Sequence, residues 1–438
     1  MKLFTAAAFA LAVIVAGEAS AASKIEPIVS PGGIKAWLVR EPAVPMVAMD
    51  FAFTGGANAD PAEKPGVANV VSAMLDEGAG ELDARAFQER MEERAIQISF
   101  SAARDNFRGS LRTLSANLDE SAELLHIALT APRFEAEPME RIRSQVLAGL
   151  RRGTTSPGDI ANKRWWAAAF PDHPYGRPNS GTLESVPQIT SEDLKGYVAK
   201  VFARGTLTVA IVGDISVERA GRLLDQVFGK LPEKANLPVV PNTSMKGLGT
   251  RAVSDMDVPQ TVINFGIPGI SRKDPDFFVA YVVNHILGGG SHTSRLYREV
   301  REARGLAYGV QTSMVWFDHA SVLSGATATR SDRARETITL IEDEFRRLAT
   351  DGPTQEELDK AKSYLRGAYA LAFDTSTKVA AQLVQIQLDD LGIDYPERRG
   401  AIIDAVTLAD AKRVARRMLD SGLLFTVVGR AQALTKTN

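Results

Sequence analysis

Apolar and polar residues alternate along several short segments in the first half of the chain, and apolar residues recur every three or four positions along others. Strict alternation predicts strands, and the longer period predicts helices with one buried face. The predicted strands are 35–40, 46–54, 96–103, 105–112 and 206–213. The predicted helices follow Pro65-Gly66 and then occupy 83–95, 116–131, 137–152 and 157–169. This order predicts an α+β fold, a mostly antiparallel sheet with helices packed on one face.

The pattern recurs in the second half. The segment VPMVAMDF at 44–51 resembles VPQTVINF at 258–265, an offset of 258 − 44 = 214. The glycines that end two further apolar segments, Gly213 and Gly429, are 429 − 213 = 216 apart. The similar spacings predict two homologous domains, 25–230 and 250–435, joined by a linker at 231–249. The alternative is a chance likeness between β-rich segments.

The second domain is expected to repeat the order of the first. Its predicted elements are a strand at 261–266, helices at 275–288 and 294–304, and a closing strand at 423–429. Three glycines, 288–290, lie between the two helices. They lack the lysine of a phosphate-binding loop, so we expect them to end one helix and bring the next close to the sheet.

The first residues have the features of a secretory signal peptide, 1–21. Lys2 is followed by an apolar run from Leu3 to Ala16, and Ala19-Ser20-Ala21 is a small-residue cleavage site, with cleavage after Ala21 or Ala22. The run is shorter than the ~20 residues that a membrane span needs, which disfavours a retained anchor. We therefore expect a periplasmic or secreted protein with no stable membrane insertion after signal cleavage.

Composition and charge exclude several classes of function. The 438 residues are 45% hydrophobic and 24% charged, which is typical of a globular protein with a sizeable core. Lys plus Arg number 51 against 53 for Asp plus Glu, so no strongly basic surface is expected and nucleic acid is an unfavoured partner. The chain has no cysteine, which excludes disulfides, thiolate metal sites and thiol nucleophiles.

Several motifs together resemble the pitrilysin/insulinase family of metallopeptidases. FTGGAN at 53–58 and GVANVVSAML at 66–75 are similar to the opening of that family, and HPYGRP at 173–178 follows. In the second half, GGGS at 288–291, VRE at 300–302 and RGLAY at 304–308 continue the resemblance. It covers nearly the whole mature chain, and it implies two similar domains that form half of a clamshell.

The sequence departs from that family at the zinc site. Active members carry H-x-x-E-H on one helix, with two histidine ligands and a glutamate base. The corresponding residues here are Asn69, Ser72 and Ala73, and the third ligand of the family aligns with Gly149 to about a residue. Alanine and glycine have no donor atom, and neutral Asn and Ser are poor zinc ligands. We expect no metal and no cofactor in this chain.

The histidines offer no replacement site. Only five occur, and His285 and His292 are separated by the triple glycine. Asp318-His319 is expected in a strand-like stretch without a second histidine nearby. His173 is expected in a loop, and Trp165-Trp166 in packing. Without a recognisable Ser/His/Asp set, autonomous chemistry of another kind is disfavoured.

The resemblance assigns a role to Arg301 and Tyr308. In the family an arginine and a tyrosine seven residues apart contact the bound peptide, and this pair matches in type, spacing and surrounding motif. A guanidinium can bind peptide carbonyls, and a phenol can donate to an oxyanion. From charge pattern alone, Arg301 would be one of several solvated arginines beside Arg295, Arg298 and Arg304, and Tyr308 a sheet residue.

These observations predict a non-catalytic, substrate-binding subunit of a heterodimeric zinc endopeptidase, similar to the non-zinc subunit of mitochondrial processing peptidase. The implied partner is a paralogous exported subunit that carries H-x-x-E-H and the zinc, and the implied ligand is a peptide. Arg301 and Tyr308 would complete the partner's site. The alternative is a non-proteolytic binding or assembly protein that reuses the fold.

Overall fold

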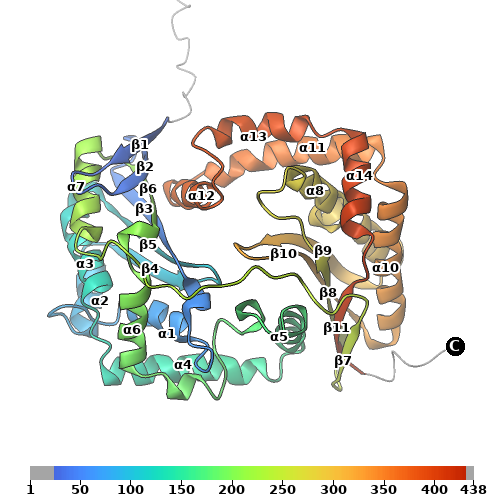
Figure 1. Cartoon of the computed structure of the whole chain (residues 1–438), viewed down its shortest axis with the longest axis horizontal. Helices are drawn as coiled ribbons and strands as arrows, with labels where there is room; N and C mark the ends of the chain where they lie inside the picture. Colours follow the sequence, from blue (N-terminus) through green and yellow to red (C-terminus); the bar gives the residue numbers. More distant parts are fainter. Residues whose placement is uncertain (1–23, 431–438) are drawn as a thin grey trace, which may run out of the picture.

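The computed structural model describes residues 24–430, which form two α+β halves that face each other (Figure 1). Each half has one sheet. The strands of the first half are β1 Ile25–Val29, β2 Lys35–Arg40, β3 Met46–Thr54, β4 Gln97–Ala102, β5 Asn106–Leu114 and β6 Leu207–Gly213. The strands of the second half are β7 Arg251–Asp255, β8 Gln260–Pro268, β9 Ala307–Trp316, β10 Ser321–Arg330 and β11 Leu424–Gly429.

Helices pack mainly on the outer face of each sheet. Those of the first half are α1 Val67–Met74, α2 Ala84–Glu93, α3 Leu118–Thr130, α4 Ala136–Gly153, α5 Pro157–Ala169, α6 Ser191–Val201 and α7 Val217–Phe228. Those of the second half are α8 Phe277–Asn284, α9 Arg295–Tyr297, α10 Ala334–Asp351, α11 Gln355–Ala370, α12 Ser376–Leu388, α13 Tyr395–Asp404 and α14 Leu408–Leu419. The predicted fold class is confirmed.

The two sheets share one strand plan. Their orders are β1-β2-β6-β3-β5-β4 and β7-β11-β8-β10-β9. All neighbours are antiparallel except the pairs β2–β6 and β7–β11. The first residues of the central strands β3 and β8 differ in number by 260 − 46 = 214, the offset seen in the sequence. The two predicted copies of this strand therefore occupy equivalent places.

One packing detail is repeated in both sheets. Phe51 on β3 lies opposite Gly109, and Phe265 on β8 lies opposite Gly325. A Cβ at Gly109 would come within 2.1 Å of the Phe51 ring, and one at Gly325 within 2.4 Å of the Phe265 ring. Only glycine leaves room for the aromatic ring, because interiors are packed without spare volume. The repeat thus extends to individual contacts in each core.

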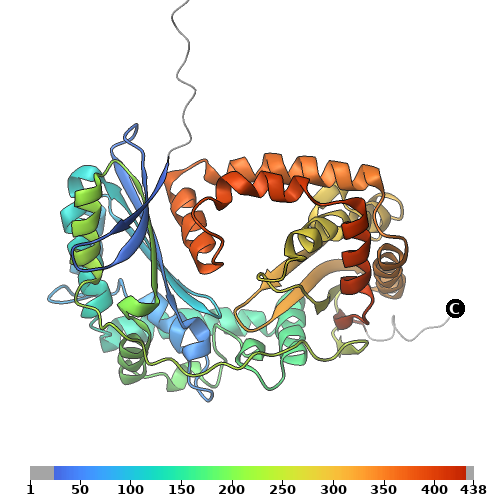
Figure 2. The ribbon, with the colours of Figure 1, turned by 45° about the horizontal axis from the view of Figure 1, so that its top comes forward.

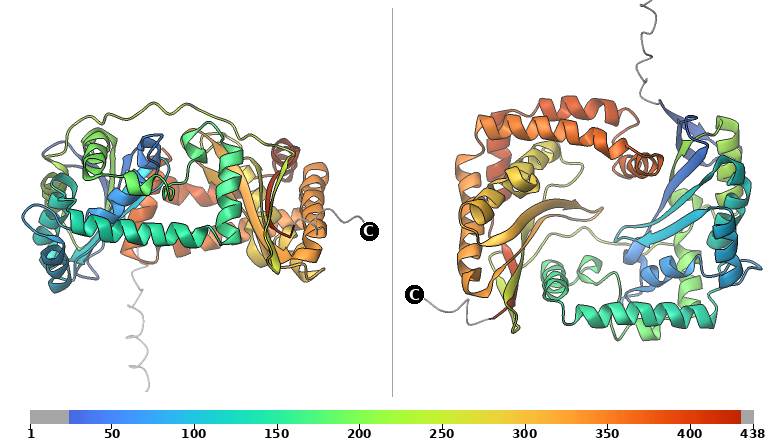
Figure 3. Two further views of the ribbon diagram at one scale, coloured as in Figure 1. Left: turned by 90° about the horizontal axis from the view of Figure 1, so that it is seen from below. Right: turned by 180° about the vertical axis from the view of Figure 1, so that it is seen from behind.

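Each half also contributes a helix to the inner face of the other sheet, as Figures 2 and 3 show. From the first half, α5 lies under the second sheet, where the indole N–H of Trp165 donates to the carbonyl of Leu424 at 3.3 Å. From the second half, α12 lies on the first sheet, where the amide of Gln387 donates to the carbonyl of Val209 at 3.1 Å. The halves are therefore interlocked by two exchanged helices.

Residues 231–249 connect the halves without a helix or strand. They are held by two histidines, through contacts of His173 Nε2 with the carbonyl of Pro241 at 2.9 Å and of His319 Nδ1 with Asn242 Oδ1 at 3.1 Å. The expectation of a strand-like stretch at Asp318-His319 is wrong, because these residues form the turn between β9 and β10. A second histidine is also nearby, since Tyr175 contacts both imidazole rings.

That turn is fixed to the first half by a buried carboxylate. Asp105 accepts hydrogen bonds from the Tyr175 hydroxyl at 2.8 Å, from Asn58 at 2.6 Å and from the backbone N–H of Asp318 at 3.1 Å. Burial, together with the charge of Asp105, raises the pKa of Tyr175 above its usual range, so its hydroxyl remains a donor. The HPYG motif is therefore part of a joint between the halves.

The predicted signal peptide lies outside the described residues. Between residues 24 and 430, none of the helices is long and apolar enough to cross a membrane.

Candidate functional site

The degenerate zinc positions lie on α1, whose start is firmly held. Gly66 precedes the helix with φ of 104°, and a Cβ there would lie 2.8 Å from the backbone of Gly181. The Asp60 carboxylate accepts from the backbone N–H groups of Gly66 and Ala68, both at 2.8 Å. Burial raises the pKa of Asp60 to about 6, although these two hydrogen bonds act in the opposite direction. The scaffold around the positions is thus intact.

Asn69, Ser72 and Ala73 share one face of α1, as their spacing requires. Gly149 lies on α4, which packs against α1. The Ser72 hydroxyl donates to the carbonyl of Asn69 at 2.8 Å, so it is used within its own helix. A Cβ at Gly149 would meet only the tip of Arg152, at 3.8 Å. Among the described residues, no group of three His, Cys, Asp or Glu side chains could hold a metal ion.

The triple glycine brings the second candidate site close to the sheet. A Cβ at Gly288 would lie 2.6 Å from the Thr312 hydroxyl on β9, so the backbone passes too close to this strand for any residue larger than glycine. A π-helical turn, Arg298–Glu302, follows and carries Arg301, while Val300 is buried beneath it. β9 begins at Ala307 and carries Tyr308 at the edge of the sheet. The fold thereby places Arg301 beside Tyr308.

Arg301 and Tyr308 are in direct contact. The guanidinium Nη1 donates to the backbone carbonyl of Tyr308 at 2.8 Å, and its Cζ lies 4.4 Å from the centre of the Tyr308 ring. The Tyr297 ring lies on the guanidinium as well, at 5.2 Å. The Tyr308 side chain is 86% exposed. The Tyr308 side chain is therefore largely open to solvent, while a cation–π contact holds its ring.

The three neighbouring arginines form ion pairs with glutamates. Arg295 and Arg298 both pair with Glu357, at 2.7 and 3.1 Å, and Arg304 pairs with Glu299. Burial would raise the pKa of Glu357, but the hydrogen bonds from Arg295 and Thr354 lower it to about 2. Arg301 forms no ion pair within residues 24–430. It is the member of this group that contacts aromatic rings and a backbone carbonyl instead of a carboxylate.

The tryptophan and the histidines discussed in the sequence analysis make packing contacts. Trp165 is buried under the second sheet beside Leu424, which confirms the prediction that it serves packing. His285 stacks on Tyr364 with ring centres 4.9 Å apart, and His292 contacts Tyr297 at 4.8 Å. His173 and His319 belong to the joint described above.

Two features of the structure have no motif that predicts them. Asp50 is a buried carboxylate in the middle of β3. In the sequence it is visible only as one charged residue within an apolar segment. Arg399 is a buried arginine on α13, outside every motif that the sequence analysis identified. Both lie where the halves meet, so their surroundings depend on residues far away in the sequence.

The fold and this site define a two-domain metallopeptidase-like protein whose own zinc positions lack ligands. A model of the insulinase family, peptidase family M16, matches residues 36–183. A second model, described as the peptidase M16 inactive domain, matches residues 188–365. The chain belongs to peptidase family M16, and the resemblance noted in the sequence is confirmed.

The relatives of this chain include one named as a non-peptidase and others named as uncharacterized zinc proteases. A non-peptidase homolog of Helicobacter pylori is 29% identical over 334 residues, 76% of this chain and 77% of that protein. An uncharacterized zinc protease of Mycobacterium bovis is 26% identical over 405 residues, 91% of this chain and 92% of the relative.

Solved structures agree in fold. The peptidase M16 inactive domain from Pseudomonas fluorescens superposes with a TM-score of 0.87 at 29% identity, covering 93% of this chain and 98% of that one. A chain of complex III2 from Candida albicans has a TM-score of 0.76 at 16% identity, covering 94% and 97%, and shows the shared fold alone.

Proposed function

We propose that this chain is the non-catalytic, substrate-binding subunit of a heterodimeric zinc endopeptidase. The observation that carries the proposal is the Arg301–Tyr308 pair. These residues are in contact, Arg301 has no carboxylate partner in the described chain, and Tyr308 is 86% exposed. In the other half, α1 keeps its shape but has no imidazole or carboxylate at the ligand positions. The chain thus retains groups for binding a peptide and lacks those for holding a metal.

The names given to relatives support the same division. The Helicobacter pylori relative is called a non-peptidase homolog, and the Pseudomonas fluorescens structure is called an inactive domain. Other relatives of similar length are called zinc proteases. A family with both kinds of chain can form pairs in which one subunit supplies the metal. The partner proposed here is a paralogous subunit with an intact H-x-x-E-H motif.

Within such a pair, the two residues would act on the peptide in the partner's site. The zinc of the partner would polarise the scissile carbonyl and activate water. The Arg301 guanidinium has donors left to bind a peptide carbonyl and hold the backbone in place. The Tyr308 hydroxyl can donate to the oxyanion as it forms. Neither role requires a metal in this chain.

The proposed compartment is the periplasm or the exterior. Lys2, the apolar run 3–16 and the small-residue site at 19–21 support export. The partner would then be exported as well, because the two subunits must meet after translocation.

Reconstitution tests the proposal. The purified chain is mixed with the product of a neighbouring H-x-x-E-H gene, and cleavage of a quenched fluorescent peptide library is followed for each protein alone and for the mixture. We expect cleavage that requires both chains and stops with a chelator. Replacing Arg301 by Gln should mainly raise KM, because it removes a carbonyl-binding group. A complex that forms and cleaves equally well with Arg301→Gln would instead make the chain a scaffold for the partner, and a mixture that cleaves no peptide would favour a non-proteolytic binding or assembly role.

A further inference from the structure

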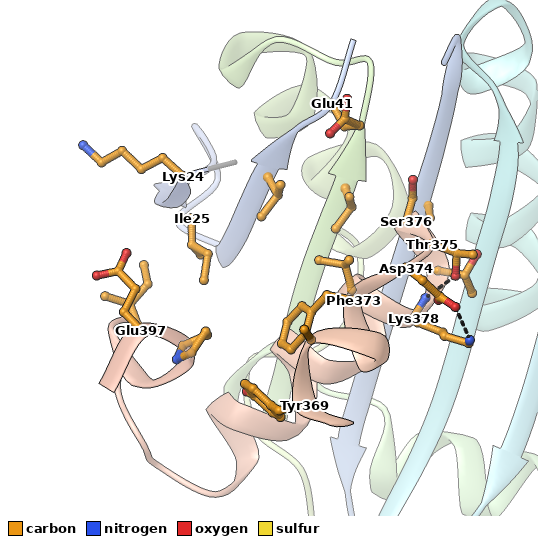
Figure 4. A pocket seen from close by; sticks show the side chains of 18 of the residues that line it. Lys24, Ile25, Glu41, Tyr369, Phe373, Asp374, Thr375, Ser376, Lys378 and Glu397 are labelled. Carbon is orange, nitrogen blue, oxygen red and sulfur yellow. Dashed lines mark hydrogen bonds and ion pairs between the residues drawn. The ribbon is translucent and has the colours of Figure 1, made fainter. Parts of the chain in front are cut away.

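A large cleft separates the inner face of the first sheet from the helices of the second half, and Figure 4 shows it at close range. Its volume is about 1320 Å³. Strand residues such as Val39, Ala48 and Val212 form one wall, and the opposite wall includes Tyr369 and Phe373. The cleft lies away from Arg301 and Tyr308, neither of which lines it.

An arginine without an acidic partner lies in this cleft. Arg399 lines it, yet its side chain is only 6% exposed. Its Nη1 donates to the carbonyl of Leu365 at 2.9 Å, and its Cζ lies 4.2 Å from the centre of the Tyr369 ring. It forms no ion pair with any residue between 24 and 430. Buried charges are normally paired, because removing an ion from water is costly.

The adjacent phenol is also incompletely bonded. The Tyr369 hydroxyl is buried and has no hydrogen-bond partner within the described part of the chain. Burial raises the pKa of Tyr369 to about 12, although the charge of Arg399 acts in the opposite direction. The phenol therefore keeps its proton at neutral pH and can donate it. A guanidinium and a free O–H donor side by side form a receptor for an anion.

The remaining charges around the cleft do not neutralise Arg399. Lys378 pairs with Asp374 at 2.9 Å, as Figure 4 shows, and Arg366 pairs with Asp404 at 3.0 Å. The Glu397 carboxylate lies on α13 at a different part of the lining from Tyr369. Three charges of the lining, those of Lys378, Asp374 and Arg366, are thus already paired. Arg399 and the Tyr369 hydroxyl are buried donors of the lining without a carboxylate partner among the described residues.

We propose that this cleft binds the C-terminal carboxylate of an apolar peptide, with the Arg399 guanidinium and the Tyr369 hydroxyl as its receptor. The volume exceeds the roughly 300–1,000 Å³ of sites for drug-sized molecules, which favours a longer ligand. The hydroxyls of Thr375, Ser376 and Thr377 along the lining suit a peptide backbone better than an acyl chain. The choice of a peptide rests on the proposed function, whereas the anion chemistry does not.

Binding to the full chain, measured without any partner subunit, tests this inference. A fluorescein-labelled decapeptide of leucine, alanine and serine is titrated by anisotropy in two forms, one with a free C-terminal carboxylate and one amidated. We expect the acid to bind about tenfold more tightly than the amide, because a charged hydrogen-bonded pair is lost in the amide. Arg399→Gln should abolish this difference, and Arg398→Gln, one residue away and outside the lining, should preserve it.

Tyr369→Phe keeps the test valid if Arg399→Gln does not fold, since it removes only a buried hydroxyl. It should weaken binding of the acid severalfold and leave the amide unchanged. Equal affinities of acid and amide would overturn the inference, and so would discrimination that survives in folded Arg399→Gln or that is undiminished in Tyr369→Phe. Binding of palmitate with no binding of either peptide would overturn it in favour of a lipid site. Because no cleavage is measured, failure here is distinct from failure of reconstitution.

Discussion

The two halves of the molecule share one plan and differ in what they place on it. In the first half, the packed helices α1 and α4 carry Asn69, Ser72, Ala73 and Gly149 at the positions that align with the zinc motif of the family. Around β9, the second half keeps an exposed tyrosine supported by an arginine that has no acidic partner. The fold can therefore form without zinc ligands, because the packing of α1 depends on other residues.

The largest effect should come from rebuilding the first site. Replacing Asn69 and Ala73 by His, Ser72 by Glu and Gly149 by Glu would restore two imidazoles at i and i+4 and two carboxylates. We expect about one zinc per chain in the quadruple variant, and none in the wild type, by metal analysis after dialysis. Zinc held tightly by the wild type would show that the first half binds metal, and would contradict the difference described between the two halves.

The exchanged helices allow a second test of the relation between the halves. Trp165 on α5 and Val384 on α12 differ in number by 384 − 165 = 219, and the starts of their helices differ by 376 − 157 = 219 as well. Both side chains are buried against the opposite sheet. Trp165→Ala should reduce the free energy of unfolding by ~3–5 kcal/mol, and Val384→Ala by roughly 1.5–3 kcal/mol.

Chemical denaturation monitored by circular dichroism checks both values. If the halves are interlocked, each variant should still unfold in one transition. A wild-type curve with two separate transitions would show instead that the exchanged helices do not couple the halves.

A smaller effect concerns one register position of the central strands. Asp50 on β3 and Asn264 on β8 are related by the same offset as the repeat, 264 − 50 = 214. The Asp50 Oδ1 atom has no hydrogen-bond partner among the described residues, while Arg108 beside it donates to Gln385 of α12. Burial raises the pKa of Asp50 to about 6, against a smaller opposite effect of the Arg108 charge.

The folded state therefore holds this proton more tightly than the unfolded chain, where the pKa is 3.8. Its contribution to stability is present below about pH 4 and is lost as the pH rises to about 6. The substitution Asp50→Asn places in the first half the residue type that the second half has at the equivalent position, Asn264. We expect the variant to be more stable than the wild type at pH 7.5, by up to about 3 kcal/mol, and equal to it near pH 4. Melting curves across this range decide the matter, and a variant that is less stable at pH 7.5 would contradict the assignment.

Much of the fold could be predicted because its signals are local. The strand at 46–54 and the helix at 157–169 were predicted with the ends that the structure gives them. The helix is marked by Ser156, whose hydroxyl accepts from the N–H of Asp159, and by Pro157 at its first turn. The repeat was visible because the central strands share a sequence pattern. Local periodicity and capping residues determine such elements.

The exchange of α5 and α12 could not be predicted in the same way. Each helix has an apolar face, but nothing in its sequence says which sheet that face will cover. The same limit applies to Asp318 and His319, where the local pattern favours a strand although these residues form a turn contacting Asp105 and Tyr175.

The pair Arg301 and Tyr308 is predictable from its motif, and the contact between the two residues follows from the seven-residue spacing across a tight turn. Arg399 had no motif, and only the assembled cleft reveals it.

The central claim is that Tyr308 acts in a partner's active site, and turnover of the Tyr308→Phe heterodimer tests it most directly. The control is Tyr364→Phe, another exposed tyrosine of the second half, which stacks on His285. With heterodimer formation and partner zinc verified in each case, we expect Tyr308→Phe to lower kcat by ~10²–10³, about 2.7–4 kcal/mol, because one oxyanion donor is removed. Tyr364→Phe should cleave at the wild-type rate. An intact, zinc-loaded Tyr308→Phe heterodimer that also cleaves at the wild-type rate would contradict the claim.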